Sequence, residues 1–434
     1  MMDNMGDFRR VILSEVNKMG DSDKREIWRE NEMKELSDLV QKRIHVLQNP
    51  QTCKMKQTLI CNLTNPSGFA SGIHDVLWCF VKAYHTNRTL VLISKHWHYA
   101  PDQWNSVFHP LSPVCDELKK TKKKSYLPGE NDSNFRSLMG ALPTDIAFRL
   151  MLAHGKPLAW WYGQFLKYIL RPQEGLLKNV QTVRMSSYEH PIVGIHVRRT
   201  DKIGNEASFH PIEEYMLHVD DFYRRLALVK NVNVRRVFVA TDDPKVLIEC
   251  KKKYPNYVFV FNSEATATAN NEKTRYSNSS LVGVVTDVFL LAHSDFLVCT
   301  LSSGLCRVAY ELMQTLHPDA SAMIRSLDVD HHYAWVLPPA RVAVYKHVAH
   351  SKKEMALEAG DTIYKKNAYD VLDEALHKRS WDGYSIGTNS RTKLSAAFLT
   401  YKTIQQYPSV IDFPKYPDYN VSLPPFDFDN LASS

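Results

Sequence analysis

The amino-acid sequence predicts an α/β protein with a doubly wound parallel sheet, an N-terminal helical segment and a small C-terminal β-barrel. Three observations lead to this prediction. Between residues 191 and 316, short β-branched runs alternate with helical runs, as in a parallel sheet with crossover helices. Residues 22–48 place apolar side chains at helical spacing. After about residue 340 the runs become short and β-rich.

The composition is that of a globular protein with a mild basic excess. The chain has 434 residues, enough for about two to four domains. Its net charge of +7 suits an anionic ligand but is too small to indicate nucleic-acid binding. No apolar run reaches the roughly 18 residues of a membrane span, and the polar N-terminus shows no signal peptide.

The first predicted element is one amphipathic helix over residues 22–48, capped by Asp21 or Ser22 and stopped by Pro50. Such a helix either covers a core or pairs with another subunit. Its apolar positions are Trp28, Met33, Leu36, Leu39, Val40 and Ile44.

Residues 53–171 alternate β-rich and helical runs. Residues 89–94 predict a buried strand, and Gly68 precedes a helix over residues 74–85. The lysine run at 118–125 indicates a solvated loop.

The regular segment follows. We predict strands at 192–197, 236–240, 257–261 and 296–300, and helices at 209–229, 281–293 and 305–316, with Thr241 or Asp242 capping the helix after the second strand. The usual glycine-rich dinucleotide fingerprint is missing. Strands at 341–347, 361–365 and 398–402 predict the barrel, and the tail from Tyr407 reads as extended.

Seven cysteines without zinc-site spacing leave two possibilities open, reduced core thiols or a sparse disulfide set. Sequons for N-glycosylation favour a secretory compartment weakly. They occur at Asn62, Asn87, Asn131, Asn278 and Asn420.

The densest polar stretch, residues 196–206, follows the first strand of the regular segment. Strand alternation puts His196 and Arg198 on one face. Ligands of open parallel sheets bind beyond the carboxyl ends of the strands, and arginine offers a fork to phosphate oxygens. The alternative is an ion-pair network that braces the loop, above all for Arg199 and Asp201.

Three further groups are candidates. Asp242 and Asp243 end the next strand, where one can cap a helix and the other can hold Arg198 or Arg199. Asp287 sits on an apolar helix and needs a partner, either within the core or in the N–H groups of a guanine. Residues 300–306 place hydroxyls and amides at a helix N-terminus, where phosphates bind.

Six ordered motifs together resemble the core α1,6-fucosyltransferase family. They are residues 196–202, 207–216, 240–244, 295–300, 307–311 and 381–384. The resemblance runs from about residue 28 to 416. It implies a two-lobed glycosyltransferase of the GT-B type with an SH3-like C-terminal domain, and an inverting transfer from GDP-fucose to the innermost GlcNAc of N-glycans, with no metal or other cofactor.

The resemblance also implies residue roles and boundaries. Glu206 would be the general base, with Lys202 beside it, and Arg198 would stabilise the departing GDP. The residues that would bind GDP-fucose are His196, Arg198, Tyr99, Asp287, Ser303 and Gly68. The residues that would support them are Arg199, Asp201, Tyr215, Asp242 and Asp243. The acceptor would bind at Asp132, Lys202 and Glu206. The expected domains are a stem (1–48), an α/β lobe (49–185), a GDP-fucose-binding lobe (186–335), the SH3-like domain (336–406) and a tail (407–434).

Family disulfides would pair Cys53 with Cys115, Cys61 with Cys79 and Cys299 with Cys306, which leaves Cys250 free. The chain departs from the family pattern at Ser67 and Ser71 (both cysteine in the family), Gly304 (glutamine), Ser380 (histidine) and Leu399 (proline), and in a shorter loop at Asp132.

The resemblance further implies a Golgi location and a homodimer through the stem. The family's membrane anchor is absent, so a soluble, truncated or alternative form is expected. Two alternatives stay open: a fucosyltransferase with another glycan acceptor, and an inactive glycan-binding module.

Overall fold

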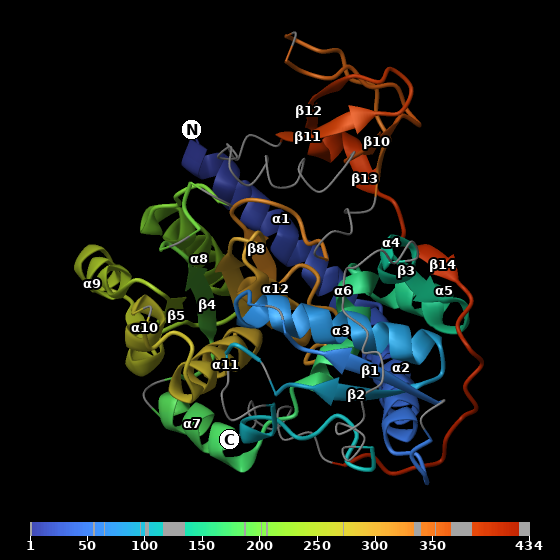
Figure 1. Cartoon of the computed structure of the whole chain (residues 1–434). Helices are drawn as coiled ribbons and strands as arrows, with labels where there is room; N and C mark the ends of the chain where they lie inside the picture. Colours follow the sequence, from blue (N-terminus) through green and yellow to red (C-terminus); the bar gives the residue numbers. More distant parts are fainter. Residues whose placement is uncertain are drawn as a thin grey trace.

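The computed structural model describes residues 2–54, 57–64, 66–95, 97–99, 104–115, 135–185, 188–200, 202–204, 207–271, 273–333, 340–351, 353–365 and 384–424. Within them lie two parallel two-stranded sheets, one parallel five-stranded sheet with helices on both faces, and one antiparallel five-stranded sheet (Figure 1). The α/β prediction is confirmed. No described helix is both long enough and apolar enough to cross a membrane.

Two helices, not one, begin the chain: α1 (Met2–Ser22) and α2 (Arg25–Gln48). The predicted cap is therefore wrong, because Asp21 and Ser22 lie inside α1. The break falls at Lys24, whose φ of 58° is left-handed, and the Asp23 carboxylate accepts the Arg25 N–H at 2.8 Å. The predicted stripe is buried at Met33, Leu36, Val40 and Ile44, but Trp28 is 41% exposed.

The N-terminal half surrounds a small parallel sheet of β1 (Thr58–Asn62) and β2 (Thr89–Ile93), joined through α3 (Phe69–His85). Aromatic side chains from α3 and α6 pack edge to face in its core. The remaining elements are α4 (Phe135–Met139), β3 (Ala141–Pro143), α5 (Thr144–Ala153), α6 (Pro157–Ile169) and α7 (Glu174–Arg184).

The central sheet has the strand order β6-β5-β4-β7-β8, with every pair parallel. Its strands are β4 (Ile192–Val197), β5 (Arg236–Thr241), β6 (Val258–Phe261), β7 (Phe296–Cys299) and β8 (Ile324–Ser326). Its helices are α8 (Ile212–Leu226), α9 (Pro244–Lys253), α10 (Ser263–Asn270), α11 (Asn278–Ala292) and α12 (Gly304–Met313). All four predicted strands are confirmed to within one residue at either end.

The two faces of this sheet are covered by different helices. Val193, Ile195 and Val197 pack with α8 and α9, whereas Phe238 and Ala240 pack with α11 and α12. A side chain at Gly194 would meet Leu291 and Ser294 near the end of α11. His196 and Arg198 alternate with the Val193 set, so they project on the α11 face.

The predicted C-terminal β region is an antiparallel sheet of order β12-β11-β10-β9-β13. Its strands are β9 (Arg341–Ala343), β10 (Thr362–Tyr364), β11 (Tyr384–Asn389), β12 (Ser395–Leu399) and β13 (Thr403–Gln405). The tail is not merely extended, because β14 (Ser409–Ile411) pairs in parallel with β3. Trp381 and Ser380 lie outside the described residues.

All three expected disulfides form: Cys53–Cys115, Cys61–Cys79 and Cys299–Cys306. Cys250 is a buried free thiol, as expected, and burial raises its pKa to about 12.

Candidate functional site

The candidate site lies where β4, β5 and β7 end. His196 is the register partner of Ala240 on one neighbouring strand and of Cys299 on the other. The residues that follow these parallel strands, Arg198, Asp242 and Ser302, therefore lie at the same edge of the sheet, and α12 begins directly after Ser303.

Arg198 is held by Asp242. Its guanidinium forms an ion pair with the Asp242 carboxylate, which is 4% exposed. The same carboxylate accepts the Arg199 N–H at 3.0 Å, the Thr200 N–H at 3.2 Å and the Thr200 hydroxyl. Burial raises the pKa of Asp242, but Arg198 and these donors outweigh burial and bring it below the ordinary value.

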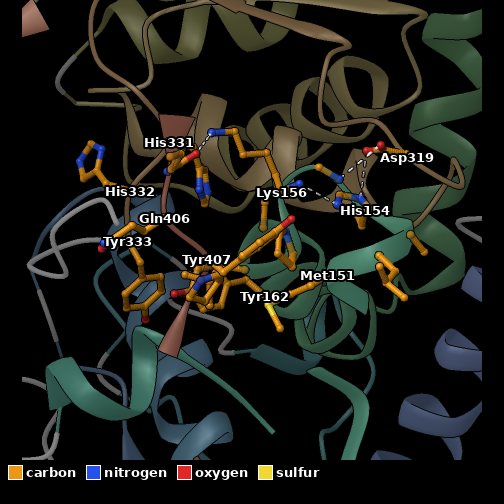
Figure 2. A pocket seen from close by; sticks show the side chains of 18 of the residues that line it. Met151, His154, Lys156, Tyr162, Asp319, His331, His332, Tyr333, Gln406 and Tyr407 are labelled. Atoms are coloured by element: carbon orange, nitrogen blue, oxygen red, sulfur yellow. Dashed lines mark hydrogen bonds and ion pairs between the residues drawn. The ribbon is translucent and has the colours of Figure 1, made fainter. Parts of the chain in front are cut away.

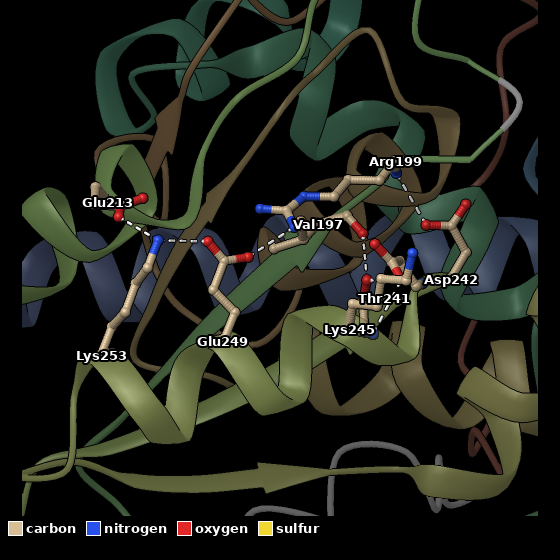
Figure 3. Close-up of polar contacts among 9 residues, drawn as sticks. Val197, Arg199, Glu213, Thr241, Asp242, Lys245, Glu249 and Lys253 are labelled. Atoms are coloured by element: carbon tan, nitrogen blue, oxygen red, sulfur yellow. Dashed lines mark hydrogen bonds and ion pairs between the residues drawn. The ribbon is translucent and has the colours of Figure 1, made fainter.

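Arg199 points away from Arg198, as the alternation predicts. It forms an ion pair with Glu249 of α9 at 2.8 Å, and its guanidinium lies over the Phe209 ring. Glu249 also contacts Lys253, which reaches Glu213 of α8 (Figure 3). Arg199 therefore belongs to an ion-pair network that braces the loop, which is the alternative that the sequence left open for this residue.

The two aspartates after β5 divide their roles. Asp243 caps α9 by accepting the Lys245 N–H at 3.0 Å, while Asp242 holds Arg198. The predicted division of this pair is confirmed, but the predicted cap at Thr241 or Asp242 is wrong. The Thr241 hydroxyl instead donates to the Val197 carbonyl at 2.8 Å, which ties β5 to β4.

His196 is buried and neutral. Burial, with smaller contributions from Arg198 and Lys202, lowers its pKa to about 4 against the attraction of Asp242. Its Nδ1 has no hydrogen-bond partner within the described part of the chain.

Asp287 lies on α11, one turn before Leu291 and thus nearer the carboxyl ends of the strands. The Asn262 side chain, which follows β6, donates to it, so the predicted need for a partner is met. Burial nevertheless raises its pKa well above the ordinary value, and its Oδ1 is buried with no partner among the described residues.

Tyr99 faces α11 from the other half of the molecule. Its hydroxyl hydrogen-bonds Ser280, which is seven residues before Asp287 and so on the same side of the helix. Its ring contacts Phe69 at 6.1 Å and Tyr276 at 5.4 Å between centroids.

Two helix N-termini adjoin at this edge. Gly68 is the N-cap of α3 and Ser303 is the N-cap of α12. Neither helix start has a capping hydrogen bond from the side chain of its N-cap residue. A Cβ on Gly304 would lie 3.0 Å from the Ala70 Cβ, so the helix starts touch. The Ser302 hydroxyl oxygen is buried without a partner among the described residues. Together the two ends offer unpaired N–H groups and positive dipole ends to an anion.

A buried glutamate joins the same two helices. The Glu311 carboxylate of α12 lies 3.0 Å from Nε2 of His74 on α3 and 2.9 Å from Nε2 of His331. Burial alone would raise the pKa of Glu311, but the two histidines lower it to about 2.

Not every predicted site residue can be placed. Lys202 is half-buried near His196, and Tyr215 is buried in α8 against the central sheet. Asp201, Glu206 and Asp132 lie outside the described residues, and with them most of the predicted acceptor side.

Several residues that contribute to the site are not predicted from the sequence. Asn262 follows the carboxyl end of β6, so the strand-end rule that selected Arg198 would also have selected it. Ser280 lies in the first turn of α11 and Glu249 lies within α9, and both act through contacts distant in sequence, so no local pattern marks them.

A cavity of about 330 Å³ lies elsewhere, between the α5–α6 turn and residues 405–408 (Figure 2). His154, Lys156 and Asp319 line it, and the Lys156 ammonium donates to Gln405 at 2.5 Å. None of the residues predicted for the donor site lines this cavity. No group of side chains that could hold a metal occurs in the part of the chain that the structure describes.

Comparisons with known proteins agree with the motifs. Residues 1–333 match the family described as alpha-(1,6)-fucosyltransferase N- and catalytic domains. The alpha-(1,6)-fucosyltransferase of Drosophila melanogaster is 39% identical over 425 residues, covering 95% of this chain and 66% of that protein. That of Caenorhabditis elegans is 33% identical over 387 residues, covering 84% and 67%. The chain thus spans about two thirds of the length of these relatives.

Among solved structures, NodZ alpha-1,6-fucosyltransferase soaked with GDP-fucose is 17% identical, with a TM-score of 0.37 over 59% of this chain and 92% of that one. This likeness is too low to support an argument. The extent of the family match and the identity to the two animal enzymes suffice: the chain belongs to the alpha-(1,6)-fucosyltransferase family.

Proposed function

We propose that this protein transfers fucose from GDP-fucose to the 6-hydroxyl of the innermost, Asn-linked GlcNAc of N-glycans. Identity of 39% over 95% of the chain to a curated alpha-(1,6)-fucosyltransferase supports this. One structural observation carries the donor part. Three buried polar atoms without partners among the described residues, on His196, Asp287 and Ser302, surround the edge where Arg198 is held.

The diphosphate of the donor would bind between Arg198 and the two helix N-termini. Arg198 is a fixed cation there, because the Asp242 carboxylate orients it before any ligand arrives. As the bond between fucose and phosphate breaks, negative charge grows on the leaving GDP. Fixed positive charge at that position stabilises the transition state more than the ground state. The first turns of α3 and α12, which begin after the N-caps Gly68 and Ser303, would supply backbone N–H groups to the same oxygens.

Guanine would bind at Asp287. Guanine presents two adjacent N–H donors, and an ionised carboxylate accepts both. Asn262 occupies one side of the Asp287 carboxylate and leaves Oδ1 for the base. Neutral His196 fits a hydrogen-bonding role beside the base or ribose, since an imidazolium is disfavoured at this buried position. Tyr99 would close the nucleotide site from the other half of the chain.

The transfer itself is a single displacement with inversion. The acceptor O6 attacks C1 of fucose, the bond from C1 to the phosphate oxygen breaks, and GDP leaves with the electron pair. The O6 proton passes to Glu206, the proposed general base, and Lys202 neutralises charge beside it. The proposal needs no metal, because Arg198, Lys202 and the helix N-termini neutralise the leaving group.

A Glu206→Gln variant tests the base. It should bind GDP as the unsubstituted protein does and lose transfer activity by at least about 10²-fold, the usual contribution of a positioned base. Glu213→Gln is the matched control, because Glu213 makes only a surface ion pair with Lys253. Transfer at the unsubstituted rate by Glu206→Gln would refute the role.

A different glycan acceptor is the second candidate. Ser380, where the family carries a histidine, and the shorter loop at Asp132 favour it. Comparing a biantennary N-glycan with and without its terminal GlcNAc distinguishes the candidates. Equal use of unrelated acceptors would favour this alternative, and donor binding without any transfer would favour an inactive glycan-binding module.

We also propose the family architecture for this chain, with a GT-B body, a stem over residues 1–48 and lobes over 49–185 and 186–335. The domain over 336–406 would be SH3-like, which its antiparallel five-stranded sheet supports, with a tail over 407–434. The proposed location is the Golgi lumen.

Pairing of stems into a homodimer is supported by exposed apolar side chains on α1. They recur at helical spacing as Phe8, Val11, Ile12, Val16 and Met19.

A further inference from the structure

The N-glycosylation sequons of this chain differ in how much room their asparagines have. Four of the five lie in the described residues, and Asn131 does not. A glycosylated asparagine must present its side-chain amide to solvent in the folded protein, because the attached glycan is bulky and hydrophilic. Burial of the side chain therefore separates usable sequons from chance ones.

Two of the four asparagines are partly enclosed. Asn62 ends β1, and its amide oxygen is buried. Asn278 is the first residue of α11, two residues before the Ser280 that binds Tyr99, and its amide oxygen is buried too. A glycan on Asn278 would enter the candidate donor site.

Asn87 has the opposite surroundings. It is exposed in the turn that follows α3, with a left-handed φ of 49°, a conformation that asparagine tolerates better than most residues. The third sequon residue, Thr89, is buried, and its hydroxyl donates to the Leu47 carbonyl at 2.8 Å. The sequon is thus anchored at the threonine while the asparagine faces solvent.

Asn420 is exposed on the C-terminal tail. The tail is fixed before this point by β14 on β3, and the Tyr416 hydroxyl donates to the Tyr84 carbonyl at 2.5 Å. Tyr84 lies in the last turn of α3, three residues before Asn87. Both exposed sequons are therefore on the side of the molecule where α3 ends.

That side is remote from the donor edge. α3 has 17 residues and begins at Phe69, where Ala70 touches Gly304. At 1.5 Å per residue its two ends lie about 25 Å apart. Glycans at Asn87 and Asn420 would leave the donor site open.

We propose that Asn87 and Asn420 carry N-linked glycans and that Asn62 and Asn278 do not. Three disulfides within the described residues fit an oxidising, secretory environment, where such glycans are added. The inference rests on the proposed compartment and is independent of the catalytic proposal.

The test directs the full chain into the secretory pathway of a eukaryotic host behind a cleavable leader. A C-terminal tag with an accepted sequon reports passage. The purified protein is treated with peptide-N-glycosidase in ¹⁸O water, which converts each glycosylated asparagine to labelled aspartate. Label at residues 87 and 420 is expected. A glycosylated tag with either residue 87 or residue 420 unlabelled, or label at 62 or 278, would overturn the proposal.

Substitutions give a second, gel-based measurement. Asn87→Asp keeps a residue that tolerates the left-handed turn and should remove one glycan from the band pattern, as should Asn420→Gln. Thr89→Ser preserves the sequon and should keep the glycan, and Asn62→Gln should change nothing. Each variant that lacks a glycan should keep the transfer activity of the unsubstituted protein, because the glycans lie away from the donor site. If the unsubstituted protein is glycosylated at these residues but transfers no fucose, the result contradicts the catalytic proposal and leaves the glycosylation proposal intact.

Discussion

Replacing Asp242 by asparagine removes the charge that holds Arg198 while keeping the side-chain shape. Within the described residues the carboxylate accepts four hydrogen bonds, three of them at Oδ2, from the Arg198 guanidinium and from the Thr200 N–H and hydroxyl. The fourth, from the Arg199 N–H, reaches Oδ1. An amide placed with its oxygen at Oδ2 would still turn its NH₂ toward the Arg199 N–H, and would leave Arg198 without a counter-charge.

The magnitude follows from these contacts. Breaking a buried ion pair by removing one partner costs about 3–5 kcal/mol. The Arg198 side chain is 21% exposed, so we take the lower end, about 3 kcal/mol of unfolding free energy at neutral pH. A loosely held Arg198 should also weaken GDP binding by about 10–100-fold, which corresponds to roughly 1.4–2.7 kcal/mol.

The pH dependence has a definite sign. Because the pKa of Asp242 is below its ordinary value, its contribution is present above the unfolded pKa of about 3.9 and is lost as pH falls toward the folded pKa. The stability difference between the variant and the unsubstituted protein should therefore shrink below about pH 4.

Urea unfolding and calorimetric titration with GDP measure both effects. Asp243→Asn is the matched control, because Asp243 only caps α9 and asparagine caps almost as well as aspartate. The reasoning is refuted by equal stability and GDP affinity in the two variants.

Two other predictions concern the nucleotide and the disulfides. Asp287→Asn should weaken GDP binding while stabilising the unliganded protein at neutral pH, because a carboxyl whose folded pKa is raised loses stabilisation as pH rises through that pKa. The GDP affinity of the unsubstituted protein should accordingly fall on acidification. Titration calorimetry measures the affinity and thermal unfolding the stability, and a loss of stability in the variant would contradict the prediction. Removing the disulfide Cys299–Cys306, whose cysteines are seven residues apart, should lower the free energy of unfolding by about 2 kcal/mol, against about 4 kcal/mol for Cys53–Cys115, whose cysteines are 62 residues apart. Denaturant unfolding of the two paired serine variants measures both losses, and a larger loss for Cys299–Cys306 would contradict the prediction.

The parts of the fold that the sequence predicts well are those with strong local patterns. The run at 192–197 is rich in β-branched residues and buried throughout, and β4 has those bounds because its two sides are buried under different helices. The position of Asp242 and Asp243 directly after a strand predicts that one caps the next helix and the other holds an arginine. In the structure Asp243 caps α9 and Asp242 holds Arg198.

Other features depend on contacts that no local pattern shows. α1 is not predicted from the polar composition of residues 1–24, and part of its support comes from tertiary contacts such as the ion pair between Arg10 and Asp221 of α8. β14 exists because β3, about 270 residues earlier, offers it an edge. Lys24 breaks the N-terminal helix with a backbone conformation that lysine seldom adopts.

The central claim is fucose transfer to the innermost GlcNAc, and one assay tests it directly. The purified chain is incubated with GDP-fucose and a biantennary N-glycopeptide in the presence of EDTA, and the product is analysed by mass spectrometry and linkage analysis. We predict one added fucose, linked α1,6 to the Asn-linked GlcNAc, at a rate that EDTA leaves unchanged. Fucose on another sugar, or no transfer despite GDP binding, would contradict the proposal.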